Sequence, residues 1–323
     1  MKKMFKLQWL SVLMLALVLV GCGTKEDTKK ETVSKEDQQV EKTTSYKVKD
    51  DRGVEVEFNA VPKTIVSLQP SNTEILFALG VGDKIVGATE YDTYPEEAQK
   101  IERVSNSEIF DSERILALQP DVVIAYTTGL DADNLNALKT LEDAGIKVFA
   151  IRSAKSFDDV YGDIEQIATV MGIEDKGDKL NEDIKAKIAE VQAKVKDVKD
   201  PKKIYLEISP KPNIYTSGSG TFQQEILNAA NVKNVFDAIQ GWKKVSEEDV
   251  IAKNPDVILS TVNKNYVENP EAEILSRDGW NSITAIQNKA VYSIDTDISN
   301  RPGPRIGEAV ELIAKAVYPE LFK

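Results

Sequence analysis

The sequence predicts an α/β protein with two three-layer α/β lobes, each built on a mainly parallel sheet, and one long rigid helix joining them. Three observations lead to this fold. Short runs of β-branched residues alternate with stretches of helical period over most of the 323 residues. A motif of helix, Pro-Asp turn and buried strand occurs twice. A single amphipathic helix separates the two halves.

The amino terminus has the pattern of an export signal. Three lysines precede an apolar run from Trp9 to Val20, which is shorter than the roughly 20 residues that span a bilayer. The run ends in Leu-Val-Gly-Cys, a segment that resembles the lipobox at which bacterial lipoproteins are cleaved before a diacylated cysteine. We therefore predict a signal peptide over residues 1–21 and a lipid anchor on Cys22. A secretory peptide with an incidental cysteine is the alternative.

Residues 22–45 are rich in charged and small polar side chains and are predicted to be a flexible tether. Cys22 is the only cysteine, so no intramolecular disulfide can hold the exported domain together. The full chain has a formal net charge of -12, and signal cleavage removes three lysines, which leaves the mature chain more negative still. Nucleic acid is therefore not expected as a partner.

The first lobe is predicted over residues 46–158. Alternating runs on either side of residues 51–53 indicate a hairpin that leads into a strand at Thr64–Leu68. A helix is expected to begin near Ser71 and to close at Gly80. Further strands are expected at Lys84–Gly87, Val122–Ala125 and Val148–Ile151, and further helices at Ser112–Leu118 and Asp133–Ala144.

Residues 159–200 are predicted to be a connecting helical region. Its apolar residues recur at steps of three and four, which indicates one long helix stopped by Pro201; they are Leu180, Ile184, Ile188, Val191, Val195 and Val198. Such a helix resists bending and would limit opening of the lobes to a small rocking motion. A coiled-coil dimerisation helix is the competing interpretation, but the stripe is short and has no partner helix, so we expect a monomer.

The second lobe, with the final helix, is predicted over residues 201–323. Strands are expected at Ile204–Ile208, Val257–Ser260 and Val291–Ile294, with helices near Phe222–Ala230 and at Gly303–Val317.

The repeated motif occupies Glu113–Ile124 in the first lobe and Glu248–Leu259 in the second, and in both copies the glutamate precedes the proline by seven residues. The lobes are therefore interpreted as related units. Caps are expected from Asp111 or Ser112 in the first copy and from a capping box of Ser246 with Asp249 in the second. The two glutamates thus fall in first helical turns. Such acids can simply complement the helix dipole, worth about 0.3–1 kcal/mol, but their matching places suit a partner with two basic sockets.

Several separated segments carry a resemblance to a known family. They are PKTIVSLQPSNTEILFALGVGDKIVGATEYDTYPEEAQKIERVS, SERILALQPDVVIAY, IYTSG, GWKKVSEEDVIA and RPGPRI. Together they resemble the helical-backbone (class III) substrate-binding lipoproteins of ABC importers, most closely the cobalamin (vitamin B12)-binding branch. The resemblance covers nearly everything from Val61 to the end. It implies a protein that captures a small molecule between two lobes and delivers it to a permease.

The resemblance also implies functions for individual residues. In that family each lobe offers a glutamate to arginines of the permease dimer, and the matching residues here are Glu113 and Glu248. The cobalamin binders line their cleft with aromatic rings, and the matching residues are Tyr91, Tyr126, Tyr215 and Trp242. Rings suit a corrin, whose apolar faces gain stacking and burial while its amide rim stays hydrated. Burial in the core is the alternative for each ring taken singly.

Two segments depart from the pattern or leave it open. Where the family often has a tryptophan after the VS of ERVS, this chain has Asn106-Ser107, so that stacking platform is missing or replaced by Phe110. The RPGPR segment matches a loop at the edge of the cleft, from which Arg301 could bond a ligand amide or carboxylate. A stiff connector into the last helix is the alternative interpretation.

Other classes of function lack the residues they need. An enzyme is not expected, because the chain has no histidine, no unlipidated thiol and no segment like a nucleophile elbow or P-loop. A carrier of bare metal ions would draw on histidine and carboxylate clusters that are not evident here, so no metal site and no cofactor are predicted. An adhesin or structural lipoprotein would have no ligand cleft.

The predicted partners are a small-molecule ligand, the permease dimer of an ABC importer, and the membrane through the lipid anchor. A corrinoid is the first choice of ligand, and a ferric siderophore or haem is the alternative. Haem would have to use tyrosine as its strong iron ligand, because the chain has no histidine. The expected location is the extracytoplasmic face of the cell membrane, in a Gram-positive-type bacterium.

Overall fold

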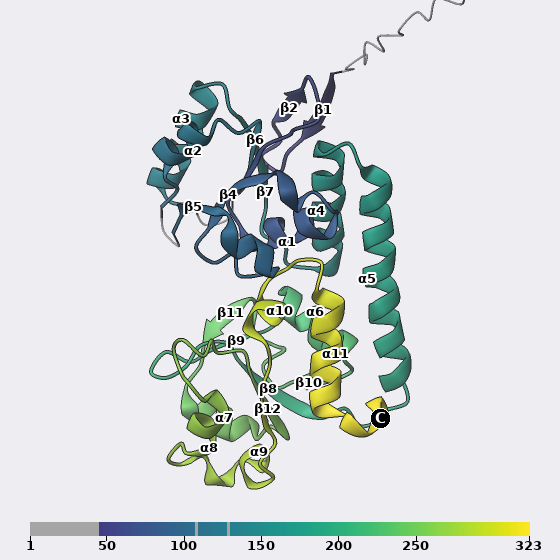
Figure 1. Cartoon of the computed structure of the whole chain (residues 1–323). Coiled ribbons are helices and arrows are strands. Elements are labelled where there is room, and N and C mark those ends of the chain that lie inside the picture. The colour runs from purple at the N-terminus through teal and green to yellow at the C-terminus, as the bar shows by residue number, and fades with distance from the viewer. Residues whose placement is uncertain (1–44, 107–108, 128–129) are drawn as a thin grey trace, which may run out of the picture. The chain divides into compact units, whose positions relative to one another are not determined.

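Two parallel sheets organise the chain (Figure 1). The computed structural model describes residues 45–106, 109–127 and 130–323, so the predicted signal peptide, Cys22 and Ser107 lie outside the described residues. The first sheet has the strand order β5-β4-β3-β6-β7, and every neighbouring pair is parallel. Its strands are β3 (Ile65–Ser67), β4 (Ile85–Thr89), β5 (Glu102–Ser105), β6 (Val122–Tyr126) and β7 (Lys147–Ile151).

The second sheet has the order β10-β8-β12-β13 and is also parallel throughout. Its strands are β8 (Lys203–Glu207), β10 (Lys233–Asn234), β12 (Val257–Ser260) and β13 (Val291–Ser293). Two antiparallel pairs complete the strands: β1 (Tyr46–Lys49) with β2 (Glu55–Phe58), and β9 (Tyr215–Ser217) with β11 (Trp242–Lys244). The predicted α/β class with mainly parallel sheets is confirmed.

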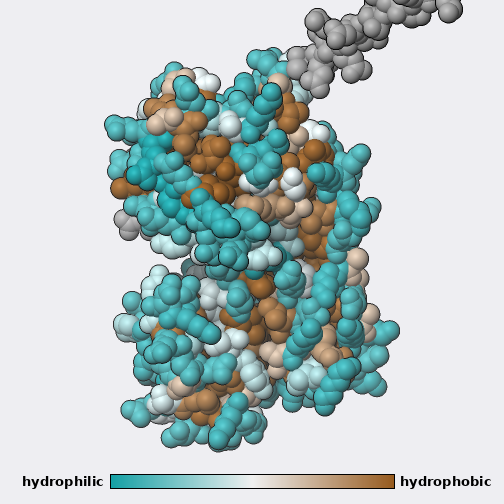
Figure 2. Space-filling model, viewed as in Figure 1, coloured by the Kyte–Doolittle hydropathy of each residue, from teal (hydrophilic) through white to brown (hydrophobic). Residues whose placement is uncertain are grey.

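Helices connect the strands, as parallel pairing requires. They are α1 (Pro70–Ala78), α2 (Ser112–Leu118), α3 (Ala132–Asp143), α4 (Phe157–Val170), α5 (Glu174–Val195), α6 (Phe222–Ala229), α7 (Glu247–Lys253), α8 (Pro270–Leu275), α9 (Thr284–Gln287), α10 (Thr296–Asn300) and α11 (Ile306–Val317). Within the described ranges, no helix combines the length and the apolar character that crossing a bilayer demands. The face shown in Figure 2 is mainly hydrophilic, in keeping with the acid-rich composition.

The long helix between the sheets is α5, and it packs along α4 and α11 (Figure 1). Its predicted apolar stripe is buried at Ile184, Ile188, Val191 and Val195. The stripe is therefore covered within the chain, which removes the seam that a coiled-coil dimer would need. The predicted end of this helix at Pro201 was wrong. The α5 helix ends at Val195, and the Val198 N–H donates to the Val195 carbonyl in a turn before Pro201.

The last helix also begins later than expected, at Ile306 rather than Gly303. Pro304 disfavours helical geometry at the residue before it, so Gly303 stays outside the helix. The RPGPR segment therefore remains a loop that leads into α11.

The repeated motif forms two matching units, α2 with β6 and α7 with β12. Asp111 caps α2 by accepting from the Arg114 amide, and Ser246 with Asp249 forms the predicted capping box on α7. Both helices end on a left-handed residue, at Gln119 (φ 48°) and Asn254 (φ 43°). The caps were predictable because short polar side chains at a helix start satisfy amides that no helical carbonyl can reach.

The aspartate of each Pro-Asp turn ties its unit to the start of a strand. Asp121 Oδ2 accepts from the amides of Lys63 and Thr64 at 2.7 and 3.0 Å, and Asp256 Oδ2 accepts from the amide of Lys203 at 2.9 Å. Burial is the largest single influence on the pKa of Asp121 and raises it, but the hydrogen bonds from Lys63 and Thr64 together outweigh it, so the pKa is lowered. The aspartates of the motif are therefore structural, because each joins its unit to a strand of the sheet.

Asp163 of α4 is a buried carboxyl, and no basic group among the described residues compensates its charge. Burial, together with the nearby carboxylates of Asp51 and Asp159, raises its pKa to about 8. An aspartate in an unfolded chain titrates near 3.9. The folded state therefore keeps a proton that the unfolded state has released, and stability falls as the pH rises from about 4 to about 8.

We expect Asp163→Asn to be more stable than the wild type, and the difference in melting temperature to grow between about pH 5 and about pH 8.5, because the amide never ionises. Thermal unfolding at both pH values measures this. Asp158→Asn changes an exposed aspartate of the same helix and should show no such growth. An equal difference at both pH values for Asp163→Asn would contradict the buried-proton account.

Candidate functional site

A pocket of about 220 Å³ lies at the carboxyl ends of β3, β4, β5 and β6, where open α/β sheets ordinarily bind their ligands. It brings together three of the predicted ligand residues, Tyr91, Phe110 and Tyr126. The other lining residues are Leu68, Gln69, Pro70, Thr89, Ser105, Asn106 and Ser153. None of these described residues carries a formal charge, so the pocket is aromatic and apolar with amide and hydroxyl groups at its edge.

Tyr91 is held by a tight turn after β4. The Thr89 amide donates to Asp92 Oδ2 at 2.8 Å, the Thr89 hydroxyl bonds the same oxygen, and the Tyr91 amide donates to Thr89 Oγ1 at 3.2 Å. Asp92 is fully buried, and burial raises the pKa of its carboxyl. The Tyr91 ring itself remains 49% exposed. The turn thus fixes the backbone and leaves the ring available to a ligand.

Phe110 and Tyr126 meet edge to face, with ring centroids 5.7 Å apart and an interplanar angle of 89°. The Phe110 amide donates to Asn134 Oδ1 at 2.8 Å, which ties the segment before α2 to α3. Phe110 is only 4% exposed, so its ring supports Tyr126 more than it offers a free face. Burial, and then the carboxylate of Asp131, raise the pKa of Tyr126, which keeps its hydroxyl protonated.

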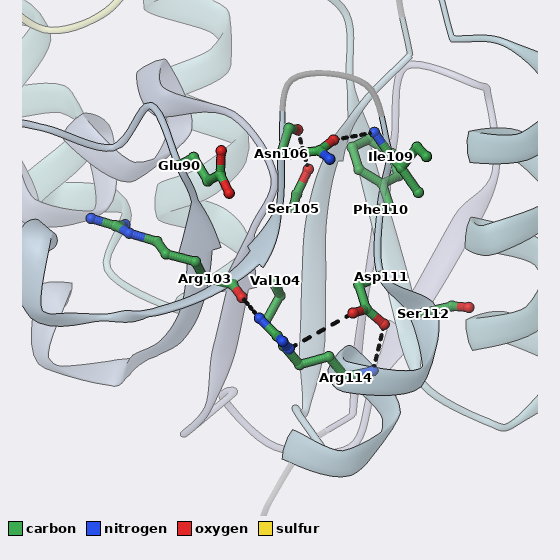
Figure 3. A pocket seen from close by; sticks show the side chains of 10 residues that line it. All are labelled: Glu90, Arg103, Val104, Ser105, Asn106, Ile109, Phe110, Asp111, Ser112 and Arg114. Atoms are coloured by element: carbon green, nitrogen blue, oxygen red, sulfur yellow. Dashed lines mark hydrogen bonds and ion pairs between the residues drawn. The ribbon is translucent and has the colours of Figure 1, made fainter.

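A second pocket, of about 390 Å³, lies beside the first and shares Ser105, Asn106 and Phe110 with it (Figure 3). Its other described lining residues are Glu90, Arg103, Val104, Ile109, Asp111, Ser112 and Arg114. In Figure 3 Arg114 faces Asp111 and the Arg103 carbonyl, and the Arg114 to Asp111 ion pair measures 3.7 Å. This pocket is charged: Arg114 pairs with Asp111, whereas the buried Nη1 of Arg103 has no hydrogen-bond partner among the described residues.

The two aromatic residues predicted in the second lobe lie on the β9–β11 ribbon. Trp242 is paired with Ser217 and Lys244 with Tyr215, so Tyr215 and Trp242 are diagonal neighbours on one face. They are 40% and 41% exposed. Trp242 Nε1 donates to Gln223 Oε1 at 3.2 Å, which anchors the indole to α6. Neither ring contributes to the pocket that holds Tyr91 and Tyr126.

Arg301 is engaged by protein groups. Its guanidinium forms ion pairs with Glu74 at 3.0 Å and Asp297 at 2.9 Å, and it donates to the Tyr91 carbonyl at 2.8 Å and to Thr93 Oγ1 at 3.0 Å. These contacts join the RPGPR segment to the loop that carries Tyr91. The interpretation of this segment as a connector and its interpretation as a cleft edge are therefore both compatible with the structure.

Glu74 is not among the site residues predicted from the sequence, and it binds Arg305 as well as Arg301. Arg305 Nε and Nη2 donate to the two carboxylate oxygens at 2.8 and 2.6 Å, and its guanidinium lies 3.9 Å from the centroid of the Tyr94 ring. Burial opposes ionisation of Arg305, but the hydrogen bonds and charge of Glu74 outweigh it and raise the Arg305 pKa. The sequence contained one indication that Glu74 is unusual, because it is the one acidic residue in the largely buried helix PSNTEILFA.

The two glutamates predicted to dock on a permease are exposed in the first turns of α2 and α7. The charged residues next to them in the sequence already have ion-pair partners: Arg114 pairs with Asp111, and Glu247 pairs with Lys211 at 2.8 Å. Within the described part of the chain, Glu113 and Glu248 form no ion pair or side-chain hydrogen bond. In those same ranges no group of three or more His, Cys, Asp or Glu residues is placed to hold a metal ion.

Comparisons with known proteins agree with this geometry. Residues 65–298 match the family described as periplasmic binding protein. An uncharacterized ABC transporter substrate-binding lipoprotein of Bacillus subtilis is 39% identical, with 98% of each chain covered. A vitamin B12-binding protein of Vibrio parahaemolyticus is 32% identical over 78% of this chain and 88% of its own.

Among solved structures, a possible iron-binding (periplasmic solute-binding) protein of Staphylococcus epidermidis matches with a TM-score of 0.71 and 32% identity. That match covers 80% of this chain and 99% of the other. The chain belongs to the periplasmic binding protein family. Within it, the chain is a substrate-binding protein of the ABC-importer type, and the relatives of this type are transport proteins rather than enzymes.

Proposed function

We propose that this protein captures cobalamin or a related corrinoid outside the cell and delivers it to an ABC-importer permease. The observation that carries the proposal is the uncharged aromatic pocket of Tyr91, Phe110 and Tyr126 at the carboxyl edge of the first sheet. A corrin presents large apolar faces and an amide-bearing rim, which suit aromatic rings and side-chain amides such as that of Gln69. The similarity to vitamin B12-binding proteins supports the same ligand.

The charges next to the pocket also favour a ligand with a neutral rim. Haem carries carboxylates, and a haem site would gain from a cation that is free to pair with them. Arg301, which donates to the Tyr91 carbonyl, is already paired with Glu74 and Asp297. An uncharged amide group of a ligand is unaffected by these ion pairs, whereas a ligand carboxylate would have to compete with Glu74 and Asp297 for Arg301.

A ferric siderophore or haem remains the alternative ligand, and the similarity to a possible iron-binding protein favours it. Haem iron would need a phenolate ligand, since the chain has no histidine. Tyr126 is a poor candidate because burial raises its pKa. Among the predicted ligand residues, Tyr91 and Tyr215 are the exposed tyrosines that a haem site would use.

Delivery is proposed to use a different surface from capture. Glu113 and Glu248 occupy matching places on the two lobes and are exposed. An exposed acid contributes little to the free protein but becomes part of a partly desolvated charge pair when it meets a permease arginine. The lipid on Cys22 is proposed to hold the protein at the extracytoplasmic face of the membrane as a monomer, near its permease.

We expect cyanocobalamin to bind and to be retained after free ligand is removed, and haemin and a ferric hydroxamate to bind more weakly; absorption spectra and calorimetry measure this.

Trp242→Ala and Tyr91→Ala should each weaken corrinoid binding by on the order of 1–3 kcal/mol, because stacking and burial are lost. Tyr292→Ala removes a partly exposed ring that lines none of these pockets and is the control. Retention of haemin in preference to cobalamin would reject the corrinoid assignment.

Replacing both Glu113 and Glu248 with alanine should abolish import while ligand affinity and melting temperature stay nearly unchanged. Each single change should cost less, and charge reversal to lysine should be worse than alanine because it adds repulsion. The double variant Asp178→Ala with Glu182→Ala removes the same charge from the exposed side of α5 and should import normally. Normal uptake by the well-folded Glu113 and Glu248 double variant would reject the docking proposal.

Cys22→Ser should leave export intact and release the protein from the membrane fraction, because one residue carries the whole lipid anchor. Fractionation of cells that lack the permease measures this without retention by docking. Membrane retention of the variant in those cells would contradict the lipoprotein assignment.

A further inference from the structure

Glu74 lies at the centre of a buried charge cluster next to the aromatic pocket. Its side chain is 1% exposed, and its two oxygens are shared between Arg305 and Arg301 at 2.6 to 3.0 Å. Arg301 is further paired with Asp297, and Thr93 donates to the same carboxylate at 2.7 Å. The cluster therefore holds two carboxylates and two guanidinium groups, and its formal charge is zero.

The cluster touches the pocket through Arg301. Its Nη2 donates to the carbonyl of Tyr91, whose ring lines the pocket. Removal of the Glu74 charge would leave Asp297 as the carboxylate that pairs with Arg301, while Asp295 would act on Arg305 only through its charge. The local formal charge would then rise by one unit, next to the buried position of Glu74 where charges act strongly.

We propose that Glu74 sets the charge preference of the ligand pocket: by neutralising Arg301 it lets the pocket accept a ring with a neutral amide rim and disfavours a ring that carries carboxylates. This inference rests on the proposed corrinoid function and extends it by naming a residue that determines specificity. Glu74 acts through Arg301 and does not itself line the pocket.

The test compares Glu74→Gln with the wild type in binding two probes: cyanocobalamin, and a metal-free dicarboxylate porphyrin that has no iron to coordinate. We expect the ratio of porphyrin to cyanocobalamin affinity to rise by about tenfold or more. The rise should shrink between about 50 mM and about 500 mM sodium chloride, because salt screens the exposed part of the attraction. An unchanged ratio in the folded variant would overturn the inference.

Glu311→Gln is the matched control, since Glu311 also bridges two cations, Lys187 at 2.8 Å and Lys315 at 2.9 Å, and it does not line the pocket. Its affinity ratio should equal that of the wild type. The double variant Glu74→Gln with Arg301→Gln restores local neutrality and should return the ratio toward the wild-type value. Equal shifts in the single and double variants would show a geometric effect and overturn the charge mechanism.

If Glu74→Gln does not fold, Asp297→Asn provides the decisive comparison. Asp297 is the more exposed carboxylate partner of Arg301, and its replacement makes the same change of local charge from the surface. A rise in the affinity ratio supports the inference, and no rise overturns it. A wild-type protein that does not bind cyanocobalamin would instead reject the corrinoid function, whatever the variants do to porphyrin binding.

Discussion

One buried carboxylate ties the carboxyl-terminal segment to the first sheet. Glu74 projects from α1, and its partners Arg301 and Arg305 belong to the loop that leads into α11. Taking an isolated charge out of water is costly, so such a group persists only where its bonds are nearly complete. Here both oxygens of Glu74 are bonded, and the loop that carries Tyr91 is attached to the same cluster. The loop that carries Tyr91, a proposed ligand residue, is therefore held both by its own turn and by contacts between residues more than 200 positions apart.

The second constraint is the packing of α5. Its buried stripe is enclosed by α4 and α11, and a partly buried ion pair from Lys187 to Glu311 joins α5 to α11 at 2.8 Å. A helix fixed along its length by two neighbours has no freely rotating peptide units, unlike a connection made of extended strands. We infer that motion between the two sheets is small and that ligand exchange depends on side chains and loops at the pocket edge.

Much of the fold could be predicted because local rules decide it. The α2 helix begins and ends at the predicted residues, since Asp111 caps its start and the Pro-Asp turn closes it. The end of α5 could not be placed from Pro201, because the chain already turns at Val195 to Val198, where the distant Asn231 side-chain amide donates to both of their carbonyls. Glu74 was missed for a similar reason: its arginine partners are distant in the sequence, and only the folded chain brings them together.

In the candidate site, too, some features could be predicted from the sequence and others depend on distant contacts. The family resemblance predicted that Tyr91, Tyr126, Tyr215 and Trp242 line one cleft. Tyr91 and Tyr126 line one pocket together, and Tyr215 and Trp242 do not line it. The charge of that pocket could not be predicted, because Arg301 looks available in sequence and is neutralised in the structure. The three glutamates differ in how much an unpaired charge costs them. Glu113 and Glu248 are exposed to water, where an unpaired charge costs little free energy, whereas Glu74 is buried, where an unpaired charge would be strongly destabilising. Exposed acids therefore suit reversible docking, and the buried acid suits a fixed contribution to ligand selection.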